Sequence, residues 1–187
     1  MKRLFTPLRL FLPLSLALTI LLTSSVHAQQ YTPVDPGSAV NFAIHNFGFS
    51  TGGHFTGLQG RIVFDPAHPA DASFDVSVDA ASVNTESDMR DNHLKKEEYF
   101  DVEKYPRIRF LSTAVTSDGK GGFHIRGKLT IKGITKDIDY PFIATPIGND
   151  YIFKGQFDIN RKDFGVGGTS TISNGLTVFL TVYAKKA

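Results

Sequence analysis

The most recognisable spacing for chemistry is a Gly-x-Ser-x-Gly pattern formed by Gly48, Ser50 and Gly52. In hydrolases such a pattern presents a nucleophilic serine on a sharp turn between a strand and a helix. Here residues 54–57 look like turn and strand, so that elbow is missing, and the glycines fit a strand bend or bulge better. We therefore predict no catalytic residue. The enzyme alternative is a hydrolase of a hydrophobic substrate, with Ser50 or His93 as its reactive group.

The histidines give no metal-binding pattern. No His-x-His or His-Glu-x-x-His occurs, and the chain has no cysteine. His45 and His54 flank one turn and could approach each other, but a pair lacks the third protein ligand of a zinc site. We predict neither a metal nor a cofactor.

Three polar residues, His93, Tyr105 and Arg161, are candidates for contact with the polar head group of a ligand. Arg161 and Asp163 lie two positions apart, on one side of an extended chain. The alternative is a structural corner, in which Asp163 accepts backbone donors and Gly165 allows the turn. We favour the corner, because it needs only the ordinary turn preferences of Asp and Gly.

The elements that carry these residues are strands. In residues 123–131 every odd position except Gly127 is apolar and every even one is polar or charged, a period that buries one face of a strand. Short turns such as Asn174-Gly175 favour antiparallel order. We predict strands near residues 39–46, 53–65, 72–80, 107–117, 122–132, 136–147, 150–160 and 174–185. Eight such strands protect their edges best by closing into an all-β, eight-stranded antiparallel barrel.

One segment interrupts the strands. Residues 86–98 lack alternation and contain no Gly or Pro, and the acids Glu86, Asp88 and Asp91 come before the lysines, as a helix dipole prefers. We predict a short helical insertion near one mouth of the barrel, with Met89, His93 and Leu94 on its inner face. It would act either as a lid or as a plug that covers core.

The first 28 residues have the composition of a secretory signal peptide. Lys2, Arg3 and Arg9 precede an apolar run, and 26–28 is a small-x-small cleavage site ending at Ala28. The mature domain would then be 29–187, a single domain in the periplasm, where a chain without disulfides relies on its core. No block of Lys and Arg suggests nucleic acid.

The predicted inward faces are almost wholly apolar. A small barrel interior is either filled by its own side chains or holds one small ligand. A guest should be a long apolar molecule, because a charged one would lose its hydration without compensation. We predict that twelve side chains contact it: Phe42, Ile44, Phe49, Phe64, Val76, Leu94, Phe110, Leu129, Ile131, Phe142, Phe153 and Phe157.

Four ordered stretches, 40–50, 93–106, 127–136 and 160–165, together resemble the YceI-like polyisoprenoid-binding family. The resemblance covers nearly all of the chain after the leader. It implies a lipocalin-like barrel with a long hydrophobic tunnel for an isoprenoid or similar lipid, commonly in the periplasm and without an assigned catalytic activity.

The function that follows is a periplasmic binding or carrier protein for a long-chain lipid, such as a polyisoprenoid, an isoprenoid quinone precursor or a fatty amide or acid. Its other partners would be a membrane, in transient contact, and a second copy of the chain, paired through an exposed strand edge. A stress-protective structural barrel packed solid, without a ligand, is the second alternative.

Overall fold

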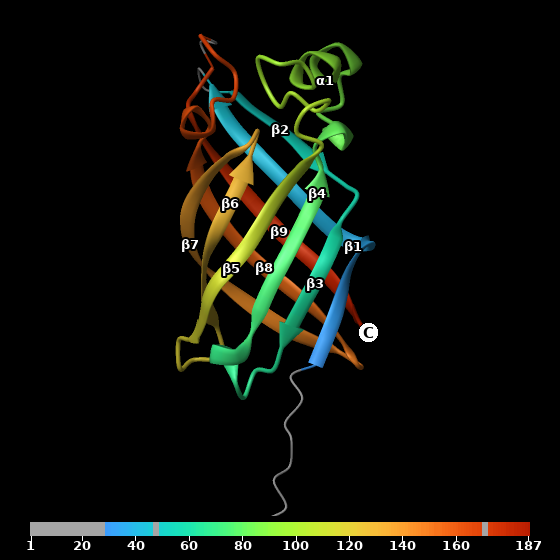
Figure 1. Ribbon diagram of the computed structural model, residues 1–187, viewed down its shortest axis with the longest axis vertical. Helices are drawn as coiled ribbons and strands as arrows, with labels where there is room; N and C mark the ends of the chain where they lie inside the picture. Colours follow the sequence, from blue (N-terminus) through green and yellow to red (C-terminus); the bar gives the residue numbers. More distant parts are fainter. Residues whose placement is uncertain (1–28, 47–48, 170–171) are drawn as a thin grey trace, which may run out of the picture.

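The computed structural model describes residues 29–46, 49–169 and 172–187 (Figure 1). The predicted leader, residues 1–28, lies outside the described residues. The strands are β1 (Gln29–Asn46), β2 (Phe49–Phe55), β3 (Gln59–Phe64), β4 (Ser73–Asp79), β5 (Arg107–Ser117), β6 (Phe123–Ile131), β7 (Ile134–Ile147), β8 (Asp150–Asn160) and β9 (Gly175–Lys186). The helix α1 (Asp88–Leu94) and the 3-10 turns η1 (Pro69–Asp71), η2 (Ala80–Ser82) and η3 (Arg161–Phe164) complete the set. Within the described part of the chain, no helix is long and apolar enough to cross a membrane.

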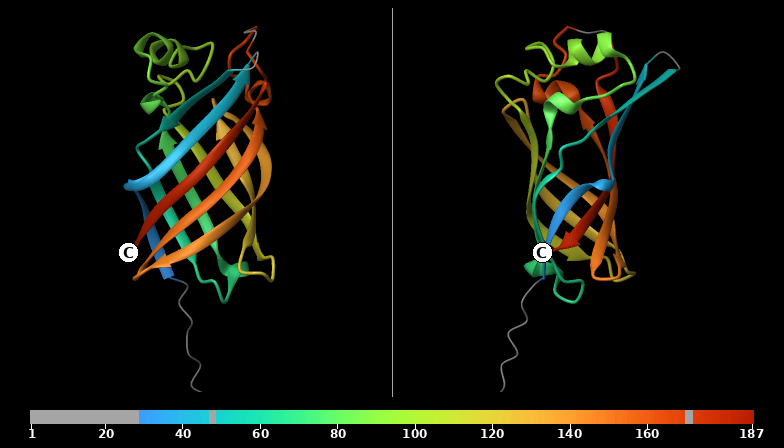
Figure 2. Two further views of the ribbon diagram at one scale, coloured as in Figure 1. Left: turned by 180° about the vertical axis from the view of Figure 1, so that it is seen from behind. Right: turned by 90° about the vertical axis from the view of Figure 1, so that its right-hand side faces the viewer.

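The sheet closes on itself. Strands β3 to β9 pair in chain order, all antiparallel, and β1 pairs with both β3 and β9. One further strand, β2, is not part of the closed ring. It pairs with residues 40–46 of β1 and extends the wall of the barrel there. The result is the predicted eight-stranded antiparallel barrel, which is confirmed (Figure 2).

Two strand predictions differ from the structure. The first strand begins at Gln29 rather than at residue 39, because residues 29–31 pair with β3 and residues 31–34 pair with β9. The pairing with β9 then shifts between Val34 and Ala39. This irregularity contains Pro36 and Gly37, whereas Pro33 pairs in register with Ala184 of β9. The Ser38 hydroxyl accepts the Tyr183 N–H at 2.8 Å within it. The predicted strand 53–65 is two strands.

The break between β2 and β3 falls at residues 56–58. Gly57 has φ 72°, a left-handed conformation that favours glycine. The carboxylate of Asp35 accepts the backbone N–H groups of Gly57 and Leu58 at 2.9 and 2.8 Å, which fixes the turn. At residues 57 and 58 the hydrogen bonds to the Asp35 carboxylate therefore take the place of hydrogen bonds between strands.

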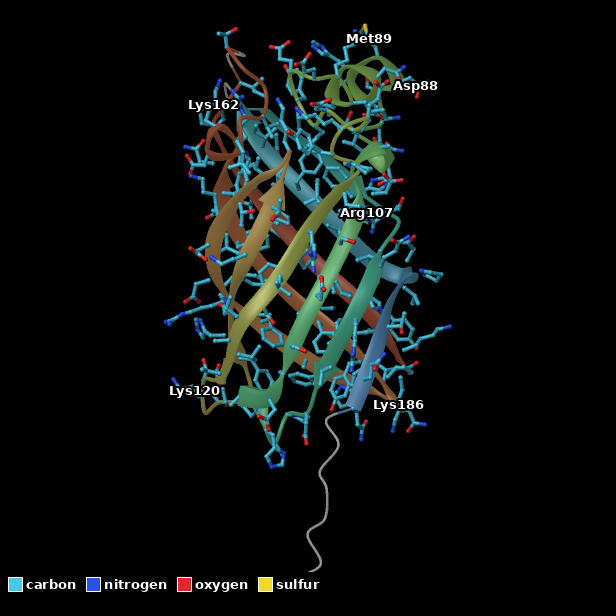
Figure 3. All side chains as sticks on the ribbon, in the orientation of Figure 1. Asp88, Met89, Arg107, Lys120, Lys162 and Lys186 are labelled. Carbon is cyan, nitrogen blue, oxygen red and sulfur yellow. The ribbon has the colours of Figure 1, made fainter. Side chains whose placement is uncertain are left out.

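A helical segment covers one mouth of the barrel, as predicted. We call residues 85–106 the lid. The labelled Asp88 and Met89 of α1 lie at the same end as Lys162 of η3, whereas Lys120 and Lys186 lie at the opposite end (Figure 3). The predicted inner face of the helix is wrong for Met89 and His93, which are exposed, because α1 is held through the buried Asp91 instead.

The half of the barrel away from the lid is filled by aromatic rings. Phe64 lies at the centre, with the rings of Phe74, Phe123, Phe142, Tyr151 and Phe153 at centroid distances of 5.2–6.3 Å, mostly edge to face. Tyr31 packs edge to face on Tyr151 at 5.3 Å. We call these seven residues the aromatic plug. The rings of the aromatic plug do not fill the part of the barrel nearer the lid.

Candidate functional site

Between the aromatic plug and the lid lies a cavity of about 350 Å³. Its wall is built from inward side chains of β1, β2, β4 to β9 and from the lid. Most of these side chains are aliphatic or aromatic. Three arginines are among the lining residues: Arg90 and Arg161 belong to α1 and η3 at the lid end, whereas Arg109 of β5 has its guanidinium bound to the Asp75 carboxylate at 2.7 and 2.8 Å. No Asp or Glu within the described residues lines the cavity.

The structure brings eight of the twelve predicted ligand contacts together around this space: Phe42, Ile44, Val76, Leu94, Phe110, Leu129, Ile131 and Phe157. Three others, Phe64, Phe142 and Phe153, belong to the aromatic plug and do not line the cavity. The side chain of Phe49 lies outside the described residues. The cavity thus ends above the plug and does not run the length of the barrel. Alternation identifies the inward face of a strand, but the level at which large rings meet and exclude space depends on the barrel as a whole.

Of the three predicted head-group candidates, Arg161 alone lines the cavity, and it is 3% exposed. Its guanidinium donates to the carbonyl oxygens of Val166 and Gly167 at 2.8 and 3.1 Å, and of Ile172 and Ser173 at 2.9 Å each. Arg161 therefore holds the loop between η3 and β9 in place. The prediction of a structural corner holds for Gly165, which has φ 65°. The side chain that holds the corner is Arg161, which donates to backbone carbonyls, whereas Asp163 is exposed.

His93 and Tyr105 lie outside the cavity wall. The exposed His93 has its Nε2 3.8 Å from a carboxylate oxygen of Glu98, and its ring packs edge to face on Tyr99. The Tyr105 ring covers Gly133 in the β6–β7 turn, so closely that a Cβ there would be 2.5 Å from it. Their contact with a head group stays a prediction.

The Gly-x-Ser-x-Gly pattern does not form an elbow. The exposed Ser50 pairs with His45 inside the β1–β2 hairpin, and β2 continues as a strand to Phe55 with no helix after the serine. His54 pairs with Asn41, four register positions from His45, so the two histidines are not opposite each other. Among residues 29–46, 49–169 and 172–187, no group of three or more His, Cys, Asp or Glu side chains could hold a metal ion.

The lid is anchored by a polar cluster that the sequence did not reveal. The buried carboxylate of Asp91 accepts the Thr85 N–H at 2.9 Å and the Thr85 hydroxyl at 2.5 Å. Arg90 donates through Nε to the same hydroxyl and through Nη2 to the Thr85 carbonyl. The Phe100 ring meets Phe55 of β2 edge to face at 5.4 Å. These polar contacts therefore fix α1 to the first residue of the lid, directly after the Asn84–His54 bridge to β2, and the Phe100–Phe55 contact joins the lid to the barrel.

Tyr140 lines the cavity but was not among the side chains predicted to contact a ligand. It lies between Ile138 and Phe142 in the alternation of β7, so its side chain points inward. Its ring packs on Phe157 at 4.7 Å and on Phe110 at 5.9 Å. Burial raises the pKa of this phenol above its ordinary value, so the hydroxyl stays protonated. In the part of the chain that the structure describes, nothing hydrogen-bonds to that hydroxyl.

Comparison with known proteins shows which family this barrel resembles in sequence and in structure. The model of the YceI-like domain matches residues 31–184. A UPF0312 protein of Pseudomonas syringae pv. tomato is 34% identical over 149 residues, which cover 76% of this chain and 78% of that protein. The crystal structure of Burkholderia cenocepacia BcnA superposes with a TM-score of 0.75 at 27% identity, over 79% of this chain and 96% of that one.

A more distant structure shares the fold. A polyisoprenoid binding domain from Saccharophagus degradans, described as implicated in plant cell wall breakdown, has a TM-score of 0.70 at 15% identity, over 84% of this chain and 98% of its own. The family model spans nearly all of the described barrel, and the fold agrees with the solved structures. This chain belongs to the YceI-like domain family.

Proposed function

We propose that the protein is a periplasmic carrier that takes the apolar chain of a lipid, an isoprenoid or a molecule of similar shape, into the cavity beneath the lid. The observation that carries the proposal is the partly enclosed apolar space of about 350 Å³ in a barrel that could otherwise have been filled by its own side chains. The solved polyisoprenoid binding domain of the same fold supports this class of guest. The leader-like composition of residues 1–28 supports secretion.

The size of the cavity bounds the guest. An apolar cavity of about 150 Å³ holds one benzene molecule. By proportion, about 350 Å³ accommodates roughly 14 carbon atoms. A chain of the farnesyl class, with 15 carbon atoms, therefore about fills the cavity, whereas a longer polyisoprenoid would leave part of its length at the mouth or would have to displace the aromatic plug.

Burial of such a chain gives enough free energy for useful binding. At about 0.8 kcal/mol per methylene, a dozen buried groups contribute roughly 10 kcal/mol. Loss of translational and rotational freedom costs about 4 kcal/mol or more. The difference, about 6 kcal/mol at most, corresponds to dissociation constants of tens of micromolar or weaker, depending on how much chain order is lost.

The cavity also bears on the alternatives. A structural barrel without a ligand would be packed solid, and the lid half is hollow. A hydrolase built on Ser50 would need the strand-to-helix elbow, and Ser50 lies within a hairpin. Membrane contact and a homodimer stay predictions.

The test is native mass spectrometry of protein secreted to the periplasm, followed by loading of stripped protein with farnesol. We expect a bound mass of several hundred daltons on the wild type. Val178→Trp places a large ring into the cavity from β9 and should abolish retention. The matched control is Phe179→Trp, the next residue, whose side chain is 42% exposed on the outer face. Wild-type protein that stays empty and refuses farnesol, or a folded Val178→Trp that retains it, would contradict the proposal.

A further inference from the structure

We propose that the guest of this cavity carries an uncharged oxygen acceptor at its inner end, and that the Tyr140 hydroxyl donates a hydrogen bond to it. The inference rests on the proposed function and names the chemical class of the guest: a ketone, quinone, ester, amide or alcohol that enters oxygen first. A plain hydrocarbon tail would not suit this position.

The first step is the state of the hydroxyl. Tyr140 is 7% exposed and lines the cavity, and its hydroxyl has no hydrogen-bond partner among the described residues. No fully enclosed side-chain polar atom in that part of the chain is left unpaired. The hydroxyl therefore keeps some accessible surface, and the space that its residue lines is the cavity. An unpaired phenol facing an apolar space is unfavourable unless something there accepts its proton.

The second step is the depth of the group. Tyr140 and Phe142 are successive inward positions of β7, roughly 7 Å apart along the strand. Phe142 belongs to the aromatic plug, so Tyr140 lies at the floor of the cavity. A lipid that enters tail first would bring only hydrocarbon to this hydroxyl and leave it unpaired.

The third step is charge. Of the three arginines among the lining residues, Arg90 and Arg161 belong to α1 and η3 at the lid end, and the half-exposed Arg109 of β5 has its guanidinium bound to the Asp75 carboxylate. No other described cationic side chain lines the cavity. One phenol donor cannot compensate the desolvation of a carboxylate or phosphate. The acceptor at the floor must therefore be neutral, whereas any anionic group of the guest would face the mouth.

The test uses two probes of equal size: methyl decyl ketone, and its methylidene analogue in which C=CH₂ replaces C=O. Both fit the estimated capacity of the cavity. Affinities for stripped, folded protein are measured by equilibrium dialysis with gas chromatography, and the carbonyl stretch of the bound ketone by infrared spectroscopy. Tyr140→Phe removes the hydroxyl alone. The matched control is Tyr151→Phe, which removes a hydroxyl in the aromatic plug, away from the cavity wall.

We expect the wild type and Tyr151→Phe to prefer the ketone, with its carbonyl stretch shifted to lower wavenumber. Tyr140→Phe should bind the ketone roughly fivefold more weakly, the equivalent of one neutral hydrogen bond, should lose the shift, and should bind the methylidene analogue at least as well as the wild type does. Equal binding of both probes, unaffected by Tyr140→Phe, would overturn the inference and leave the carrier function standing. Refusal of both probes by the wild type would overturn both.

Discussion

Phe64 gives the sharpest test of how the barrel is held together, because it touches more of the aromatic plug than any other ring described there. It is 1% exposed, and five rings surround it at centroid distances of 5.2–6.3 Å. Phe64→Ala removes this contact centre and leaves a hole among rings that are fixed by their own strands. We expect a large loss of stability.

The magnitude follows from the packing. Burial of a phenylalanine side chain contributes about 1.5–3 kcal/mol, and the empty space and the lost ring contacts add to that. Large aromatic-to-alanine changes cost about 3–5 kcal/mol, less where the neighbours can collapse into the space. The surrounding rings leave little room for collapse, so we expect about 4–5 kcal/mol. For a chain of this length the melting temperature should fall by roughly 10–20 °C.

The assay is equilibrium unfolding in urea followed by circular dichroism. Phe179→Ala serves as the control, since this phenylalanine is 42% exposed on the outer face of β9 and should lose less than about 1 kcal/mol. Phe64→Leu should fall between the two. A loss below about 2 kcal/mol for Phe64→Ala would refute the idea that these rings form a closely packed plug.

Two further predictions concern the cavity wall and its corner. Gly127→Ala would place a Cβ 2.4 Å from the Phe110 ring and 2.6 Å from the Leu111 carbonyl oxygen. We expect a loss of about 1–3 kcal/mol in urea unfolding, together with weaker farnesol binding because Phe110 is pushed into the cavity; unchanged values for both would count against this packing. Arg161→Lys keeps the charge but loses the planar fork that reaches four carbonyls. It should cost about 2–4 kcal/mol and speed amide exchange at residues 165–169, and wild-type exchange there would contradict the anchoring role.

Period-two alternation was sufficient to predict most of the barrel, because burial of one face is decided locally along each strand. Strands such as β6 and β8 appear with nearly the predicted bounds. The first half of β1 escaped prediction because Pro33, Pro36 and Gly37 resemble a loop, and pairing with β3 and β9 on either side of residues 35–38 makes it a strand. The break at Gly57 depends on Asp35, a partner far away in the chain.

The candidate site was less predictable, because it depends on how inward side chains meet in space. Phe42 and Phe153 have the same pattern in sequence, but one lines the cavity and the other belongs to the aromatic plug. The buried Thr85–Asp91 contact lies in a segment of mostly exposed polar residues, so composition gives no sign of it. Tyr140 was missed because its hydroxyl suggests an outward position, although the alternation of β7 turns it inward.

The separation of the aromatic plug from the hollow half has a consequence for how such proteins diverge. The rings of the aromatic plug and the side chains that line the cavity are different residues at different heights in the same barrel. Substitutions in the cavity wall near the lid can therefore change the shape of the cavity while the packing of the aromatic plug is unchanged. A scaffold arranged in this way can be adapted to new molecules without being rebuilt.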